Sequence, residues 1–341
     1  MESKDIFARL AAAEDKSSQQ GETGDKDDSF LVVVGPKNSG KTSLVMYFLN
    51  PNKLDEPKPT AALDYVYARR AVPGSNRKAV AHIWELASSK KVLDLLKVPL
   101  SPERLPKSAL MLVLDLSAPG EVVPSLVYWV NLIRKLLADT PSGFTTEQAL
   151  AKYGSTHPDR REVSPIPLPL LIVGSKYDTF RDEDSVKRKG LVQAVRYIAH
   201  SIGATVVFTS VKDKALATQF RATLSAAVYS TEAKTTKEVE KGLFIPAGTD
   251  TFEEIGLPKG ARPADLEDAN WDKRMRLWTK AAAELYASNV KETADEEEKD
   301  EAEDKFPEPT IDALRKQKRE ELRRYKEKKT EKKPAKKEAK D

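Results

Sequence analysis

The sequence GPKNSGKT at 35–42 fits the pattern G-x-x-x-x-G-K-[ST], whose spacing suits a loop that binds phosphate groups. The two glycines let the backbone wrap an anion with its N–H groups, Lys41 reaches the outer phosphates, and the Thr42 hydroxyl can ligate Mg²⁺. The apolar run FLVVV precedes this loop, and an apolar helical segment follows it. We therefore predict a phosphate loop between a strand and a helix N-terminus. The alternative is a loop that keeps the shape and binds nothing.

A second group of residues could read a base. GSKYD at 174–178 resembles the N-K-x-D motif of Ras-like GTPases, with Ser175 in place of asparagine. In that family Lys176 would lie along the base, and Asp178 would accept two hydrogen bonds from guanine that adenine cannot donate. TSVK at 209–212 resembles the T-S-A-K motif that supports the base from its other side. We favour guanine over adenine, and the alternative for GSKYD is a surface turn after a strand.

The candidate ligands follow from these motifs. Thr60 lies where Ras-like proteins place a switch threonine that senses Mg²⁺, although a threonine that merely opens a strand is the alternative. The expected cofactor is GDP or GTP with Mg²⁺ held by Thr42 and Thr60, unless the loop is empty. The candidate nucleotide-binding residues are Gly35, Asn38, Ser39, Gly40, Lys41, Thr42, Ser43, Lys176, Asp178, Ser210 and Lys212.

The residues expected to support hydrolysis depart from the Ras-like pattern. The second switch of those proteins reads D-x-x-G followed by a glutamine that positions water. The matching stretch WELASS at 84–89 has Glu85 for the aspartate, Ser88 for the glycine and Ser89 for the glutamine. We therefore predict little or no GTPase activity and no catalytic residues.

The alternation of apolar runs with amphipathic stretches predicts an α/β fold. Strands are expected at 30–34, 62–72, 79–86, 108–117, 169–175 and 204–210, with helices at 41–49, 124–137, 185–203, 213–229 and 270–287. Strands separated by helices indicate a mostly parallel sheet flanked by helices, with one antiparallel hairpin strand at 62–72. An extended strap at 242–256 and an amphipathic helix follow.

The domain organisation is read from composition. Residues 1–28 are expected to form a flexible N-terminal arm and 29–230 a P-loop domain of Ras-like type, with a surface insertion at 138–168. Residues 231–290 would carry the strap and the amphipathic helix, which pack on this domain or contact a partner. The tail at 291–341 is densely charged and is expected to be partly helical or disordered.

Composition excludes several classes of function. The chain has no cysteine and only three histidines (His82, His157 and His200), which disfavours disulfides and a His-rich metal site. The net charge is +4, and the basic tail has few aromatic residues, so nucleic acid is not an expected partner. No apolar run approaches the roughly 20 residues that span a bilayer, and no secretory signal is expected, so we predict a soluble intracellular protein.

Beyond these motifs, the ordered segments KPTAALDYVYARR, AHIWELAS, PIPLPLLIVGSKYDTF and LFIPAGTDTFEEIG resemble the family of cytoplasmic dynein 2 light intermediate chains. The resemblance covers roughly 30–290 and implies a non-catalytic subunit that binds the tail of the dynein 2 heavy chain. It also implies other dynein 2 subunits and intraflagellar transport trains as partners. The implied role is retrograde intraflagellar transport and cilium assembly. The implied location is the cytoplasm and the microtubule cytoskeleton, with the cilium or flagellum including its axoneme and basal body.

Two other functions remain open on the residues alone. One is an active GTPase whose nucleotide state switches partner binding in transport. The other is a P-loop kinase or ATPase, which the position of GSKYD at a strand end disfavours.

Overall fold

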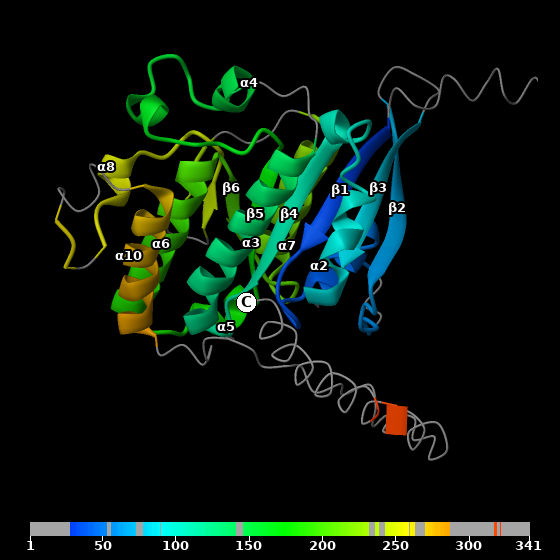
Figure 1. Ribbon diagram of the computed structural model, residues 1–341, viewed down its shortest axis with the longest axis horizontal. Helices are drawn as coiled ribbons and strands as arrows, with labels where there is room; N and C mark the ends of the chain where they lie inside the picture. The colour runs from blue at the N-terminus through cyan, green and yellow to red at the C-terminus, as the bar shows by residue number, and fades with distance from the viewer. Residues whose placement is uncertain are drawn as a thin grey trace, which may run out of the picture. The chain divides into compact units, whose positions relative to one another are not determined.

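The computed structural model describes residues 28–52, 56–72, 78–88, 90–140, 146–231, 236–238, 243–258, 260–262 and 270–286, with 317, 318 and 321 in the tail (Figure 1). The chain divides into two compact units, 1–289 and 290–341, and the fold below belongs to the first. Apart from Asp28, the predicted N-terminal arm lies outside the described residues. The predicted charged tail also lies outside them, except for those three positions.

The central layer is a seven-stranded sheet with strand order β2-β3-β1-β4-β5-β6-β7 (Figure 1). The inner strands from β3 to β6 run parallel, while β2 and β7 run antiparallel at the two edges. The strands are β1 (Asp28–Val34), β2 (Leu63–Ala71), β3 (Lys78–Leu86), β4 (Ser108–Asp115), β5 (Leu170–Ser175), β6 (Thr205–Phe208) and β7 (Phe244–Ile245). The predicted fold class is confirmed, with a second antiparallel edge pair that the sequence did not reveal.

Helices cover both faces of this sheet because alternate side chains of each buried strand point to opposite sides. Leu31 and Val33 pack with α2 (Lys41–Leu49) and α7 (Lys214–Tyr229), whereas Val32 and Val34 belong to the core under the other helices. That second layer consists of α3 (Pro119–Asp139), α6 (Ser185–Ile202) and α10 (Trp271–Leu285). Shorter elements are η2 (Lys90–Lys97), η3 (Leu105–Lys107), α4 (Thr146–Leu150), η4 (Pro158–Arg161), α5 (Tyr177–Phe180) and α8 (Phe252–Ile255).

The helix boundaries follow local capping signals. Asp184 accepts hydrogen bonds from the N–H groups of Val186 and Lys187 and so begins α6, which ends at Gly203 with a left-handed φ of 68°. The helix predicted over 124–137 begins earlier, at Pro119, because this proline takes the first turn and Pro124 lies inside the helix.

The strap expected at 242–256 is an integral part of the sheet and its covering layer. Phe244 and Ile245 form β7, pair with β6 and are almost fully buried. Further along, Asp250 is 2% exposed and accepts hydrogen bonds from Arg196 of α6 at 2.6 and 2.8 Å. The Gln193 side chain donates to the Ile255 carbonyl at 2.6 Å. The strap and the amphipathic helix α10 both pack on their own domain, which is the first of the two alternatives that the sequence left open.

The segment expected as a surface insertion at 138–168 contributes to the core. Its residues Tyr153, Ile166 and Leu168 are each no more than 2% exposed. Lys152 donates hydrogen bonds to the carbonyls of Ile166, Leu168 and Gly203, and burial lowers the pKa of its ammonium to about 8. The buried residues of the described part of the segment therefore join the core, and Lys152 and Tyr153 bond to backbone carbonyls at the end of α6.

Two of the three histidines meet in this region. His157, Asp159 and His200 offer ligand atoms within 4.8 Å of one another. His157 donates to the Asp250 carbonyl and accepts from the Asp159 N–H, and His200 donates to the Asp159 carboxylate at 2.9 Å. That carboxylate also accepts from the N–H of Phe252 at 2.8 Å. These hydrogen bonds hold the strap against η4 and α6. We assign no metal to this group of side chains.

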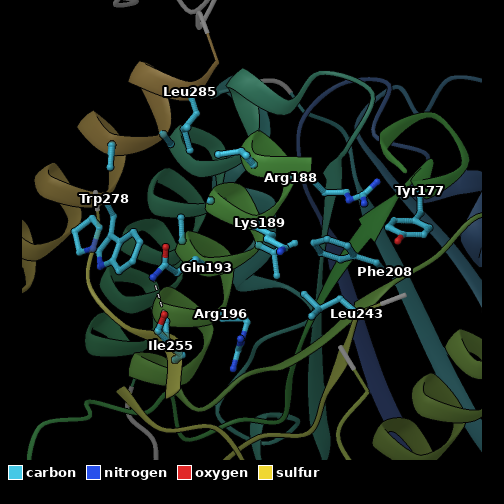
Figure 2. Close-up of a pocket in the computed structure, with 17 residues that line it drawn as sticks. Tyr177, Arg188, Lys189, Gln193, Arg196, Phe208, Leu243, Ile255, Trp278 and Leu285 are labelled. Atoms are coloured by element: carbon cyan, nitrogen blue, oxygen red, sulfur yellow. Dashed lines mark hydrogen bonds between the residues drawn. The ribbon is translucent and has the colours of Figure 1, made fainter. Parts of the chain in front are cut away.

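A cavity of about 670 Å³ lies between α6, α10 and the strap (Figure 2). Trp278 and Leu285 reach into it from α10, Ile255 comes from α8, and Phe208 forms part of its inner wall. Figure 2 also shows Arg188, Lys189 and Arg196 of α6 around this space. None of its described lining residues belongs to the phosphate loop at 35–42, so the cavity is separate from that loop. Only Tyr177 comes from the GSKYD motif.

Candidate nucleotide-binding site

The loop between β1 and α2 has the backbone geometry that a phosphate cradle requires. Gly35 has a φ of 146°, and a Cβ atom there would lie 2.2 Å from the Val113 carbonyl oxygen of β4. Gly40, at the N-cap of α2, has a φ of 88°, and Asn38 is also left-handed with a φ of 61°. Only glycine fits at 35, because the loop there lies against the neighbouring strand.

The first turn of α2 offers the amide groups that bind anions. Leu44 donates to the Gly40 carbonyl at 3.0 Å, so the N–H groups of Lys41, Thr42 and Ser43 precede the helical ladder and have no intrahelical acceptor. The Ser39 hydroxyl is buried and has no partner among the described residues. These groups fit an anionic phosphate at a helix N-terminus.

Lys41 is buried and its ammonium is held by three oxygen atoms. It donates to the carbonyls of Gly35 and Pro36 at 3.1 and 2.9 Å and to the Ser88 hydroxyl at 2.9 Å. Burial lowers the pKa of Lys41 to about 8, although the Glu85 carboxylate opposes this shift. The cation is therefore largely protonated at neutral pH, and a bound phosphate would have to compete for it with these oxygens.

The two threonines expected to ligate Mg²⁺ meet at Glu85. The Thr42 hydroxyl donates to Glu85 Oε1 at 2.6 Å, and the Thr60 hydroxyl donates to the same oxygen at 2.9 Å. Glu85 is longer than the aspartate of Ras-like proteins by one methylene, which brings its carboxylate to both hydroxyls. Hard oxygen donors of this kind suit Mg²⁺, so these three residues would hold it. A cavity of about 430 Å³ adjoins Thr42 and Glu85.

The base-reading motifs lie at the same end of the sheet. Asp178 Oδ1 accepts from the Ser210 hydroxyl at 2.7 Å, and its Oδ2 accepts from Lys212 Nζ at 2.8 Å. Lys212 and Ser210 hold the pKa of the Asp178 carboxyl below its ordinary value, so this group is ionised at neutral pH. Each carboxylate oxygen can accept a second bond, which leaves capacity for the N1–H and N2–H₂ groups of guanine.

Ser175 joins the phosphate and base ends of the candidate site. Its hydroxyl lies 2.5 Å from the Ser39 carbonyl in the loop and 2.9 Å from the Leu114 carbonyl at the end of β4. The next residue, Lys176, donates to Asp115 Oδ2 at 2.5 Å. Ser175, although it replaces the asparagine of the Ras-like motif, therefore connects the GSKYD motif to the phosphate loop through its hydroxyl.

Two contributions were not found by sequence reasoning. Asp115 positions Lys176, and the only signal in the sequence was a carboxylate at the end of an apolar central strand. Ser88 replaces the glycine of the Ras-like pattern, and its hydroxyl donates to the Gly35 carbonyl at 2.8 Å, a contact that the pattern does not predict. The second-switch position therefore holds the loop and its lysine in place. Among the described residues near Lys41, none is a glutamine that could position water.

The strand order, the phosphate loop and the two edge strands define an α/β domain with a Ras-like fold. The chain belongs to the dynein light intermediate chain family, whose model matches residues 14–150. It is 33% identical to the human cytoplasmic dynein 2 light intermediate chain 1, over 96% of both chains. The zebrafish (Danio rerio) protein of the same name is also 33% identical, over 95% of both chains.

The similarity extends to a more distant relative and to a solved structure. The human cytoplasmic dynein 1 light intermediate chain 1 is 24% identical over 67% of this chain and 51% of its own length. A solved crystal structure of the dynein light intermediate chain's conserved domain superposes with a TM-score of 0.58 and 15% identity. It covers 74% of this chain and 97% of that domain. The similarity to the dynein 2 proteins is therefore both higher and more extensive.

The described helices include none that is long and apolar enough to cross a membrane.

Proposed function

We propose that this chain is a non-catalytic light intermediate chain subunit of the cytoplasmic dynein 2 motor, which binds the heavy-chain tail and supports retrograde intraflagellar transport and cilium assembly. The observation that carries the proposal is the similarity to cytoplasmic dynein 2 light intermediate chains over 96% of the chain. Movement would be powered by the heavy-chain ATPase. The protein would be found in the cytoplasm and along the microtubules of the cilium or flagellum, including the axoneme and the basal body.

The arrangement of the phosphate loop supports a structural role for any nucleotide. Lys41 and Ser88 bond to each other and to the loop, and the stretch that matches the second switch contains no glutamine. We propose that GDP or GTP with Mg²⁺, when bound, stabilises the domain by mass action and is not turned over. Other dynein 2 subunits and intraflagellar transport trains would be the further partners.

The proposed function is tested by co-purification of the full chain with the dynein 2 heavy-chain tail. We expect Lys41→Ala to leave heavy-chain binding within about twofold of wild type, while stability falls by about 1–2 kcal/mol because several hydrogen bonds are lost. A dynein 1 heavy-chain tail is the matched control and should bind weakly. Failure of the wild-type chain to bind the dynein 2 tail would overturn the proposal.

If Lys41→Ala folds yet abolishes binding, the chain is instead a nucleotide-dependent switch. Deleting the chain after about residue 240 would not test whether the strap and α10 contact the heavy chain. The deletion would remove β7 from the sheet and α10 from the core, and so would disturb the fold itself.

Single-turnover hydrolysis separates a held nucleotide from a cycling one. We expect GTP mixed with excess protein and Mg²⁺ to be cleaved well below the intrinsic Ras rate of roughly 4 × 10⁻⁴ s⁻¹, because the water-positioning group is missing. Nucleotide released by denaturing freshly purified protein, then separated by chromatography, identifies what is retained. Cleavage at the Ras rate would show a working GTPase.

A further inference from the structure

We propose that β2 is a self-complementary edge strand through which two copies of this chain form an antiparallel dimer. The strand is nine residues long, and nothing in the described part of the chain pairs with its outer edge. It stands at one end of the sheet in Figure 1. Tyr65 and Tyr67 on this strand are 42% and 49% exposed. Exposed edges of this length are sites where another strand can add.

The hydrogen-bonding pattern shows which groups face outward. Ala87 N–H donates to the Ala62 carbonyl at 2.7 Å, and these two residues continue the β2–β3 register by one position beyond the Leu63–Leu86 pair. In an antiparallel ladder, opposite pairs alternate between bonded and non-bonded. The even-numbered residues of β2 therefore bond to β3, and the odd-numbered residues present their backbone groups to the outside. The outward set is Leu63, Tyr65, Tyr67, Arg69 and Ala71.

The sequence of the strand complements itself when a second copy is placed antiparallel around Tyr67. Asp64 then lies opposite Arg70 of the second copy, and Tyr65 lies opposite Arg69. Opposite charges and cation–π contacts are favourable cross-strand pairs. Tyr67 faces itself on the two-fold axis. The remaining pairs, Leu63 with Ala71 and Val66 with Ala68, are apolar.

No other register has these properties. Any shift separates Asp64 from Arg70, and centring the pair on Arg69 would place two guanidinium groups opposite each other. In the register centred on Tyr67, each odd-numbered residue lies opposite an odd-numbered residue of the second copy. The backbone groups that point outward on the two strands therefore face one another. Up to about ten backbone hydrogen bonds would form, and the two-fold closes the edge so that no further copy can add.

The charged groups are available for this exchange. The Asp64 carboxylate now accepts from the N–H of Tyr65 at 2.9 Å, an outward group that the second strand would bond instead. Arg70 makes an exposed contact of 3.2 Å with the Ser225 hydroxyl and lies 5.5 Å from the centre of the Tyr229 ring. Asp64 and Arg70 point to the same sheet face, so they can pair across the two-fold. A single strand pair buries little surface, so the dimer is weak unless both copies are held on one assembly.

The cysteine-free chain allows a direct test by single-cysteine crosslinking under mild oxidation with diamide. Tyr67→Cys should form disulfide-linked dimers at least about tenfold faster than Tyr128→Cys, because opposite strand residues lie within disulfide distance. Tyr128 is a matched control on α3 with 42% exposure. Equal crosslinking rates of the two variants would overturn the proposal.

The register is tested by mixing variants. Leu63→Cys and Ala71→Cys should crosslink when mixed and only slowly when each is alone, since these positions face each other. Rapid self-crosslinking of Leu63→Cys would indicate a parallel pair and would refute the antiparallel one.

Charge reversal gives an independent measurement by sedimentation velocity. Asp64→Arg or Arg70→Asp should each weaken self-association about tenfold, because two attractive pairs become repulsive. A mixture of the two variants restores complementary pairs and should associate at least as well as wild type. Thermal melts establish that each variant is folded. Mixtures that associate no better than the separate variants would exclude the dimer.

Discussion

Replacing Trp278 with alanine should lower the free energy of unfolding by about 3–5 kcal/mol. Trp278 is 1% exposed, and its ring lies 4.8 Å from that of Tyr197 on α6, measured between centroids. The loss combines the transfer of a large apolar group with the cavity left behind. Because Trp278 already lines the 670 Å³ cavity in Figure 2, the substitution would enlarge an existing space.

Urea titration of the full chain measures this effect, with Arg276→Ala as the matched control. Arg276 is exposed on the same helix, and its substitution should change stability by no more than about 0.5 kcal/mol. A loss below about 1 kcal/mol for Trp278→Ala would mean that α10 is not part of the cooperative unit. The result matters for function, since α10 was one of two segments that could have contacted the heavy chain instead.

Replacing Asp250 with alanine should cost about 3–5 kcal/mol, because it leaves a buried guanidinium without its counterion. The Asp250 carboxylate accepts two hydrogen bonds from Arg196, whose side chain is 13% exposed, and lies 3.2 Å from Lys237 Nζ. Its backbone carbonyl also accepts from His157, so the residue anchors the strap at two points. The acid-to-alanine change should therefore loosen β7 and α8 together.

The control for this substitution is Glu253→Ala, an exposed acid on α8 that should change stability by no more than about 0.5 kcal/mol. A double variant, Arg196→Met with Asp250→Ala, should recover part of the loss, because the unpaired charge is removed. If Asp250→Ala and Glu253→Ala have equal effects, the buried ion pair does not stabilise the strap.

The contribution of Asp250 should also depend on pH. Burial alone would raise the pKa of its carboxyl, but Arg196 and Lys237 outweigh this and hold the pKa below its ordinary value. A carboxyl with a depressed pKa stabilises the fold above its unfolded value and loses that stabilisation as the pH falls through its folded value. The difference between wild type and Asp250→Ala should therefore be constant near neutrality and shrink below about pH 4. Urea titrations at a series of pH values measure it.

The sequence by itself determined where the main strands lie along the chain, the phosphate loop and the departure from the Ras-like switch pattern. Each of these depends on residues close together in the chain, such as Gly35 and Lys41, or on the apolar period of one element. The fold class and the family could therefore be predicted. The roles of the candidate nucleotide-binding residues stay predictions, although the structure brings them to one end of the sheet.

Only the tertiary structure decided how distant segments meet. The sequence predicts only an extended strap at Phe244 and Ile245, because a two-residue strand is too short to show a period. Pairing with β6 makes these two residues a strand of the sheet. His157 and His200 seemed scattered, yet the turn at η4 brings them together with Asp159. Ser88 departs from the Ras-like glycine in the sequence, and only the structure shows that its hydroxyl accepts a hydrogen bond from Lys41. In each case the stabilising contact joins residues far apart in the chain, and local composition carries no information about such partners.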